Sequence, residues 1–315
     1  MDKKKHISVL TPCYNEEGNM AKMVETLNEV FQKLPQYTFE HVIIDNNSTD
    51  NTQEVLRAQA AKYKHVKVIL NEANFGWIKS HFHGLVQCKG DAVIFMSSDF
   101  QDPPSLIPQF LEKWEEGFRL VIGIKKQSKE NFLIFGMRKM FYRLLSKVSD
   151  GPPTIQNFTG FGLYDQKFIS VIRDLDDPYP YFRGLVSEFG FRRYEIPYEQ
   201  PKRMVGKSNA NFFRLYDLAM LGFTSHSKMP LRLSAFIGFF SSIVSFLVAL
   251  GYFIYKLIYW YDFNVGMAPM VIGVFFFSSV QLFFIGIIGE YIGAIHTHIR
   301  KRPLVIERER INFDS

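Results

Sequence analysis

Two long apolar runs near the C-terminus, residues 233–255 and 267–289, dominate the hydrophobic pattern of the chain, and neither contains a charged side chain. Each has about the length of a helix that crosses a bilayer, because roughly 20 residues rising about 1.5 Å each span a hydrocarbon layer ~30 Å thick. The few residues between the runs allow only a tight connection. The pattern therefore predicts a two-helix transmembrane hairpin over 231–299, after a long segment of mixed polarity.

The first 125 residues have a different pattern, in which short apolar runs alternate with amphipathic segments of helical period. The apolar runs predict buried strands at 7–11, 42–44, 66–70, 92–96 and 120–122. Strands that alternate with helices at this spacing predict an α/β fold with a doubly wound, mainly parallel sheet. Ligands of such sheets bind at the carboxyl ends of the strands. The polar loops after the first, second and fourth strands are therefore expected to lie together.

Two further segments are amphipathic: residues 130–150, which are basic, and residues 211–230, which lie just before the first apolar run. The second predicts a juxtamembrane helix at the bilayer interface. For both, the alternative is an ordinary surface helix packed on the core. The expected organisation is thus a domain over 1–210, the juxtamembrane helix, the hairpin over 231–299 and a tail over 300–315.

The net charge of +6 is concentrated beside the apolar runs, at Lys202, Arg203, Lys207, Lys228 and Arg232 before the first and Arg300, Lys301 and Arg302 after the second. The positive-inside rule therefore predicts that both termini and the large domain are cytoplasmic. No nucleic-acid recognition module is evident, so a nucleic-acid partner is not expected. Two cysteines, Cys13 and Cys88, suit a reducing compartment better than a disulfide framework. The charged N-terminus lacks the apolar stretch of a signal peptide.

The loops after the first two strands hold groups that suit a nucleoside. In the first loop Pro12 can fix the backbone, Tyr14 can cover a flat base and Glu16 can accept from a ribose or base donor. The alternative is a strand-to-helix turn in which Asn15 caps the helix. After the second strand, Asp45 can accept the imide N–H of uracil or the ring N–H of guanine.

The loops after the third and fourth strands hold groups that suit a diphosphate. Lys79 brings a cation to this edge, where it can pair with a diphosphate or simply be solvated. The fourth strand ends in closely spaced oxygen side chains, including Ser98, Asp99 and Gln101. Such a set suits a hard cation, Mg²⁺ or Mn²⁺, that neutralises a departing nucleoside diphosphate. The alternative is a polar turn with Asp102 as a helix N-cap.

These loop motifs, in this order, resemble the GT-A type catalytic domain of glycosyltransferase family 2. The resemblance continues through Arg183-Gly184-Leu185, residues 199–208, residues 224–232 and the two apolar runs. Over nearly the whole chain it is a resemblance to bacterial polyprenyl-phosphate glycosyltransferases, which are similar to dolichyl-phosphate mannose synthase. Each motif is short, so the specificity lies in their order together with the hairpin.

The resemblance implies transfer of one sugar from a nucleotide-sugar donor, by analogy a UDP-sugar, to undecaprenyl phosphate. The lipid phosphate would be the nucleophile, the anomeric centre would invert, and the reaction would occur at the cytoplasmic face of the bacterial inner membrane. A homo-oligomer is compatible with such an anchor. The implied site comprises Pro12, Tyr14, Glu16 and Asp45 on the nucleoside, Lys79, Ser98 and Lys125 near the donor, Asp99 and Gln101 on Mg²⁺ or Mn²⁺, and Arg203 and Lys207 on phosphates.

The chain also departs from the family pattern, and the departures leave open the metal shell, the acceptor-phosphate contacts and the sugar. They are Ser97 and Asn46 where acids are expected, Gly160-Phe161-Gly162 in place of Asp-Phe-Arg, Gln200 in place of arginine, and Asn209 in place of lysine. Two alternatives follow. A processive polysaccharide synthase would normally show a Gln-x-x-Arg-Trp motif, and no Arg-Trp pair occurs in the chain. A catalytically weak, membrane-anchored nucleotide-sugar-binding protein is the other.

Overall fold

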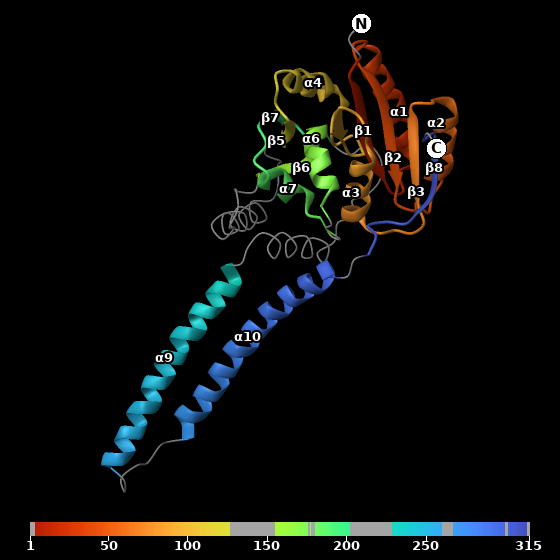
Figure 1. The fold of residues 1–315 in the computed structure, drawn as a ribbon. Coiled ribbons are helices and arrows are strands. Elements are labelled where there is room, and N and C mark those ends of the chain that lie inside the picture. Colours follow the sequence, from red (N-terminus) through yellow and green to blue (C-terminus); the bar gives the residue numbers. More distant parts are fainter. Residues whose placement is uncertain are drawn as a thin grey trace.

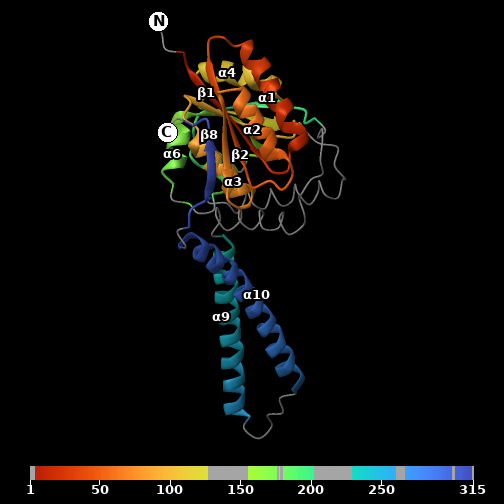
Figure 2. The same cartoon turned by 90° about the vertical axis from the view of Figure 1, so that its right-hand side faces the viewer.

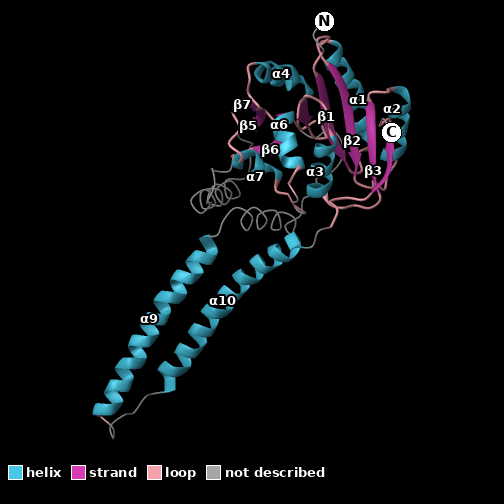
Figure 3. Cartoon of the chain, in the orientation of Figure 1, coloured by secondary structure: helices cyan, strands magenta, loops and turns pink. Residues whose placement is uncertain are grey.

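The computed structural model describes residues 4–126, 155–175, 177, 180–201, 229–259, 267–299 and 302–313. It consists of an α/β domain and two long helices that extend from it (Figures 1 and 3). The strands are β1 (His6–Cys13), β2 (Thr38–Asp45), β3 (Val66–Asn71), β4 (Ala92–Phe95), β5 (Leu120–Lys125), β6 (Phe158–Asp165), β7 (Arg193–Tyr198) and β8 (Glu307–Ile311). The helices of the domain are α1 (Glu17–Gln32), α2 (Thr52–Lys62), α3 (Trp77–Gln87), the 3₁₀ turn η1 (Pro104–Leu106), α4 (Ile107–Glu115), α6 (Gln166–Arg173) and α7 (Phe182–Glu188).

The described strands form one eight-stranded sheet in the order β7-β5-β6-β4-β1-β2-β3-β8. The predicted α/β fold is confirmed, and all five predicted strands are present as β1 to β5. The sheet is mixed, however, with four parallel and three antiparallel pairings, because β6 and β8 run against their neighbours. The parallel run β4-β1-β2-β3 forms its centre, so the loops after these strands share one edge.

The two faces of the sheet are covered by different helices, and the alternation of side chains along each strand separates the core into layers. Val9 packs with side chains of α1 and α4, whereas the next residue, Leu10, packs with side chains of α3 and α6. Both residues are fully buried. The central strands are therefore apolar on both faces, which explains why they appear in the sequence as continuous apolar runs.

The C-terminal segment is not a simple tail, which corrects the expectation for residues 300–315. Strand β8 pairs antiparallel with β3 and closes that edge of the sheet. Its charged sequence, Glu-Arg-Glu-Arg, is typical of a solvated segment. Its backbone nevertheless pairs with β3 and satisfies N–H and C=O groups of β3 that would otherwise be exposed. The domain predicted over 1–210 is thus completed by residues that follow the apolar helices.

The two apolar runs form α9 (Met229–Ile258) and α10 (Met267–Ile299), which lie next to each other beyond the domain (Figures 1 and 2). Among the described residues, α10 contains the one stretch long and apolar enough to cross a membrane, Phe276–Gly293, and none of it is buried. Large apolar side chains on both helices are exposed, among them Phe236 at 64 % and Leu282 at 69 %. The amphipathic segment 130–150 and nearly all of 211–230 lie outside the described residues.

One buried carboxylate at the opposite end of the sheet makes the domain sensitive to acid. Glu40 is 4 % exposed and accepts from the Ser8 hydroxyl over 2.5 Å, while the Lys67 ammonium lies 2.7 Å away. Burial raises the pKa of Glu40, but the hydrogen bonds from His6, Lys67 and Ser8 outweigh it and lower that pKa to about 2. The carboxylate is thus more stable in the folded chain than in the unfolded one.

We therefore expect stability that is fully present above the unfolded pKa, near 4.3, and is lost as the pH falls toward 2. The loss assigned to Glu40 is on the order of 3 kcal/mol, since each pKa unit corresponds to about 1.4 kcal/mol. Urea unfolding of the purified protein between pH 7 and pH 2 measures it. The Glu40→Gln variant should be less stable at pH 7 and should lose less on acidification. An equal acid dependence in both proteins would contradict the assignment.

Candidate functional site

Three polar loops lie together at one edge of the sheet, because β4, β1 and β2 are parallel neighbours. Asn15 joins two of them: its backbone N donates to the Ser48 hydroxyl over 2.9 Å, and its Oδ1 accepts from the backbone N of Thr49 over 2.8 Å. Each loop has one left-handed residue, Asn15 (φ 57°), Asn47 (φ 60°) or Phe100 (φ 62°). This conformation is unusual for a bulky side chain such as Phe100, and strain of this kind clusters at functional sites.

The predicted nucleoside residues after β1 all lie at this edge. Pro12 is buried near the end of β1, and Tyr14 is half-buried two residues later. Glu16 is 7 % exposed and precedes α1, where its carboxylate accepts from Nδ2 of Asn19 over 2.6 Å. The alternative in which Asn15 caps this helix is wrong, because the Asn15 side chain bridges the two loops instead.

Asp45, at the end of β2, is fully buried, and donors hold both of its oxygens. Oδ1 accepts from the Ser48 hydroxyl and, over 3.8 Å, from the Cys13 thiol. Oδ2 accepts from the backbone N of Ser48 over 3.0 Å and from Nε2 of Gln53 over 2.8 Å. Burial and the nearby Asp45 raise the pKa of Cys13, so the thiol keeps its proton. Sequence reasoning found Asp45 but missed Gln53, which belongs to no motif.

Asn46 stands where an acid is common, and its contacts explain why an amide is used. Its Nδ2 donates to Oδ1 of Asn74 over 2.9 Å. Its Oδ1 accepts from Nδ2 of Asn71 over 3.2 Å and from the backbone N of Phe75 over 3.1 Å. A carboxylate could accept these two bonds but could not donate the first. Asn46 thus fixes the turn between β3 and α3.

Asp102 fixes the loop after β4. Its Oδ2 accepts from the backbone N of Ser97 over 2.9 Å, and its Oδ1 accepts from the phenol of Tyr198 in β7 over 3.0 Å. Asp102 is therefore not the helix N-cap considered above, since these bonds engage both of its oxygens. Burial raises its pKa, and the bonds from Ser97 and Tyr198 oppose that rise. Within the loop, Oδ1 of Asp99 accepts from the backbone N of Gln101 over 3.1 Å.

The donor set of this loop fits a divalent cation that arrives with a diphosphate. The described residues contain no cluster of three or more His, Cys, Asp or Glu that could hold a metal on its own. Asp99 (9 % exposed), Gln101 and the neighbouring Ser98 (6 % exposed) offer oxygens within four consecutive residues. Mg²⁺ is usually bound through one or two carboxylates plus substrate phosphates and water. One carboxylate and a carboxamide are enough for that mode.

The remaining predicted residues are less closely tied to this edge. Lys125 ends β5, and its Nζ donates to Oε1 of Gln200 over 2.8 Å, so the glutamine found in place of an expected arginine holds the lysine. Lys79 lies half-buried in the first turn of α3. Arg203 and Lys207 lie outside the described residues, so their predicted contacts with phosphates stay predictions.

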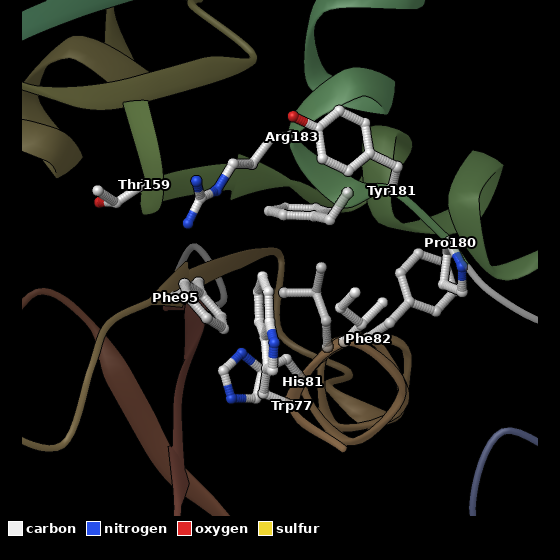
Figure 4. A pocket seen from close by; sticks show the side chains of 11 residues that line it. Trp77, His81, Phe82, Phe95, Thr159, Pro180, Tyr181 and Arg183 are labelled. Carbon is white, nitrogen blue, oxygen red and sulfur yellow. The ribbon is translucent and has the colours of Figure 1, made fainter. Parts of the chain in front are cut away.

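Beside these loops is a hollow that opens to solvent and measures about 470 Å³ when the open space at its mouth is included. It adjoins the loop of Asp99, because Phe95 both ends β4 and lines the hollow. Its walls come from α3, the ends of β4 and β6 and the start of α7, and are mostly aromatic or apolar. Figure 4 labels eight of the lining residues: Trp77, His81, Phe82, Phe95, Thr159, Pro180, Tyr181 and Arg183.

Arg183 brings a positive charge to this hollow, and its guanidinium points inward (Figure 4). Its Cζ lies 5.9 Å from the centroid of the Trp77 ring. In the part of the chain that the structure describes, no carboxylate forms an ion pair with it. Burial and the charge of Arg183 lower the pKa of His81 to about 3, so His81 is neutral. A half-buried charge is normally paired, so the hollow suits an anionic group joined to an apolar one.

The glycines that replace the expected acid and arginine in β6 are required by its backbone and its neighbours. Gly160 has φ +105°, and a Cβ there would lie 3.4 Å from the Phe95 ring. A Cβ at Gly162 would lie 2.6 Å from the carbonyl oxygen of Val121 and 3.0 Å from Cα of Ile122. An arginine at position 162 would therefore force β5 and β6 apart.

We accordingly expect Gly162→Ala to destabilise the domain by about 1–3 kcal/mol, the range for overpacking a tight site. The obstructing atoms belong to the backbone of β5, so no side-chain rotation relieves them. Thermal or urea unfolding of the purified variant measures the change. An unchanged unfolding midpoint would mean that β5 can move aside at no cost.

Comparison with known proteins identifies the family. Residues 8–173 match the family described as Glycosyl transferase family 2, a region that covers more than half of the chain and all strands from β1 to β6 except the first residues of β1. The chain belongs to glycosyltransferase family 2, and it is a glycosyltransferase.

Its relatives extend the likeness through the C-terminal helices. The uncharacterized glycosyltransferase YkcC of Bacillus subtilis is 31 % identical over 98 % of this chain and 95 % of its own length. The SfII prophage-derived bactoprenol glucosyl transferase of Shigella flexneri is 33 % identical over 95 % of this chain and 96 % of its own. Among solved structures, glucosyl-3-phosphoglycerate synthase from Mycobacterium tuberculosis covers 70 % of this chain and 76 % of its own at 17 % identity, with a TM-score of 0.49.

Proposed function

We propose that the protein transfers a single sugar from a nucleotide-sugar donor, by analogy a UDP-sugar, to undecaprenyl phosphate at the cytoplasmic face of a bacterial inner membrane. An oxygen of the lipid phosphate attacks the anomeric carbon. The bond from that carbon to the nucleoside diphosphate breaks, the diphosphate leaves with the electron pair, and the anomeric centre inverts. The lipid phosphate is already anionic, so the reaction needs no strong general base.

The donor side of this proposal rests on the three loops at the sheet edge. Bonds from Ser48 and Gln53 hold the carboxylate of Asp45 in one orientation at the end of β2. Pro12, Tyr14 and Glu16 line the neighbouring loop. Preorganised groups of this kind bind the nucleoside and orient the sugar without reorganising during the reaction.

Asp99 and Gln101, with Ser98 beside them, would hold Mg²⁺ or Mn²⁺. Such an ion, when bound, neutralises charge on the diphosphate as it leaves. Lys79, Lys125, Arg203 and Lys207 would add positive charge around the donor and acceptor phosphates. The residues themselves bind and orient the phosphates, and Asp102 and Tyr198 keep the loop of Asp99 in position.

The observation that carries the acceptor side is Arg183 in its aromatic hollow. A guanidinium that has no carboxylate partner among the described residues and lies among aromatic and apolar side chains matches a phosphate joined to an isoprenoid chain. The hollow adjoins the loop of Asp99, so an acceptor phosphate held there lies next to the donor site. In Figure 1, α3 and α7 lie on the side of the domain from which α9 and α10 extend, and Figure 2 shows the same for α3. A lipid reaching the hollow from the bilayer would arrive from that side.

The membrane part of the proposal is a two-span hairpin, α9 and α10, with both termini in the cytoplasm. It is supported by the exposed apolar side chains of both helices and by the apolar stretch Phe276–Gly293. Contiguous apolar surface of this extent is rare on soluble monomers and marks an interaction surface such as a membrane. The bactoprenol glucosyl transferase of Shigella flexneri, similar to this chain over nearly its full length, favours a polyprenyl acceptor.

The test is incubation of the purified full-length protein with undecaprenyl phosphate, Mg²⁺ or Mn²⁺, and a panel of labelled nucleotide sugars. We expect label in the organic phase with one donor and only when the lipid phosphate is present. Chain extension beyond one sugar would instead indicate a polysaccharide synthase. Nucleotide binding without transfer to the lipid would indicate the catalytically weak alternative.

A further inference from the structure

Strand β8 brings the C-terminal end of the chain to the nucleoside edge of the sheet. The backbone N of Glu72 donates to the carbonyl of Ile306 over 2.9 Å, and Glu307 pairs with Asn71, the last residue of β3. Because β8 runs antiparallel to β3, its first residues lie where the parallel strands end. The strand that follows α10 therefore starts close to the loop that holds Asp45 (Figure 1).

A β-bulge in β8 sets the direction of one arginine. Glu307 and Glu309 pair with consecutive residues of β3, so Arg308 between them is an extra residue. Successive side chains of a regular strand alternate between the two faces, and a bulge changes that alternation. Arg308 consequently shares the α2 face with Glu309, whose carboxylate pairs with Arg57 of α2. Arg310 lies on the α3 face, where it donates to Gln87 over 2.8 Å.

On the α2 face, Arg308 contacts the helix residue that reaches Asp45. Its Nη2 donates to Oε1 of Gln53 over 2.5 Å, and Nε2 of Gln53 donates to Oδ2 of Asp45 over 2.8 Å. A guanidinium has only donors and a carboxylate has only acceptors. The carboxamide of Gln53 can therefore bridge them in one orientation alone, with its oxygen toward Arg308 and its NH₂ toward Asp45.

We propose that Arg308 is a positioning residue of the nucleoside site, which fixes the amide of Gln53 so that it donates to Asp45. The inference rests on the proposed function, in which Asp45 accepts from the nucleobase. Without Arg308 the amide oxygen of Gln53 loses its partner, so the Gln53 side chain is less restricted and holds Asp45 less firmly. The C-terminal strand thereby contributes to the donor site although no residue of β8 belongs to the loops that form it.

The first test is Arg308→Ala in the full-length protein, with the kinetics of donor and lipid measured separately. We expect KM for the nucleotide sugar to rise about 5- to 10-fold, which corresponds to the loss of one hydrogen bond, here the bond from Arg308 to Gln53. We expect kcat and KM for the lipid to stay unchanged. Arg308→Lys keeps a donor for Gln53 and should restore most of the affinity. Arg310→Ala is the matched control, because it removes an arginine of the same strand from the opposite face, and it should leave donor KM unchanged.

Gln53→Glu separates positioning from a purely structural role. A glutamate at this position would form an ion pair with Arg308 and hold β8 at least as firmly, but it would place a second carboxylate against Asp45. We expect the variant to remain folded at the assay temperature, with β8 held by the ion pair, and yet to bind the nucleotide at least 10-fold more weakly. Parent-like nucleotide affinity in Gln53→Glu, or donor KM rising equally in Arg308→Ala and Arg310→Ala, would overturn the inference.

Calorimetry with UDP or GDP and Mg²⁺ distinguishes a failure of the proposed function from a failure of the role proposed for Arg308. If the parent protein binds neither nucleotide, the proposed function fails and the role of Arg308 fails with it. If the parent binds one of them and Arg308→Ala binds it equally well, only the role of Arg308 is wrong. Weaker binding in Arg308→Ala, restored in Arg308→Lys, supports both.

Discussion

Asp99→Asn is expected to lower kcat roughly 100- to 1,000-fold while leaving the fold intact, the range for losing one group that stabilises charge in the transition state. The carboxylate is the one negatively charged oxygen donor in the Ser98–Gln101 stretch, so its amide isostere removes the attraction for a divalent cation and retains the shape. The bond from the backbone N of Gln101 to Oδ1 can persist in the variant, since the amide keeps an oxygen. Label transferred to the organic phase at saturating donor, lipid and metal measures the loss.

Asp174→Asn is the matched control for this substitution. Asp174 is an exposed acid at the end of α6, away from the three loops, and its change to asparagine should leave the rate unchanged. Unfolding curves of both variants should coincide with that of the parent. Full activity in Asp99→Asn would show that this loop does not bind the metal. An equal loss of activity in both variants would show that the loss is not specific to Asp99.

Arg183→Ala should raise KM for undecaprenyl phosphate about 10- to 100-fold, because a hydrogen bond to a charged group in a partly dry site is worth about 1.5–3 kcal/mol. Donor KM should change little, since the hollow is separate from the loops around Asp45. Arg183→Lys keeps the charge but loses the planar fork that binds phosphate through two bonds, so we expect an intermediate KM. Initial rates at varied lipid and fixed donor provide the measurement.

Arg193→Ala serves as the control, because Arg193 is an exposed arginine on β7 whose partner is Glu195 rather than a lining residue of the hollow. It should leave both KM values unchanged. A second readout comes from His81: removing the charge of Arg183 should raise the pKa of His81 from its value of about 3, which a titration by NMR can follow. If lipid KM is unaffected while that pKa rises, Arg183 faces the hollow but does not bind the acceptor.

The centre of the fold could be predicted from the sequence because most of each strand from β1 to β5 is buried and its central residues form a short apolar run. Three strands outside that pattern, β6, β7 and β8, could not. Strand β7 begins with three exposed residues. The Glu-Arg-Glu-Arg sequence of β8 has no apolar face, and its stability as a strand depends on ion pairs with α2 and α3, such as Arg57 with Glu309. In β6, Gly160 and Gly162 weaken the strand signal, and the reason for them lies in neighbouring strands.

The candidate site shows the same division. Side chains that follow strands within one motif, such as Asp45 and Asp99, were found because the carboxyl ends of parallel strands converge. The contacts of Gln53, Arg183 and Arg308 join segments that are separate in the chain. No local sequence motif therefore predicts them. Arg183 was visible as part of Arg183-Gly184-Leu185, but its proposed role follows only from its position among aromatic side chains, with no carboxylate partner in the described part of the chain.

The position of β8 after α10 also dictates an order of biosynthesis. The edge of β3 stays open while the ribosome makes α9 and α10, and it is closed only when residues 307–311 emerge. Open edges of this kind template unwanted pairing between nascent chains. A chain that is terminated early anywhere in the apolar helices therefore has a sheet whose β3 edge is unpaired.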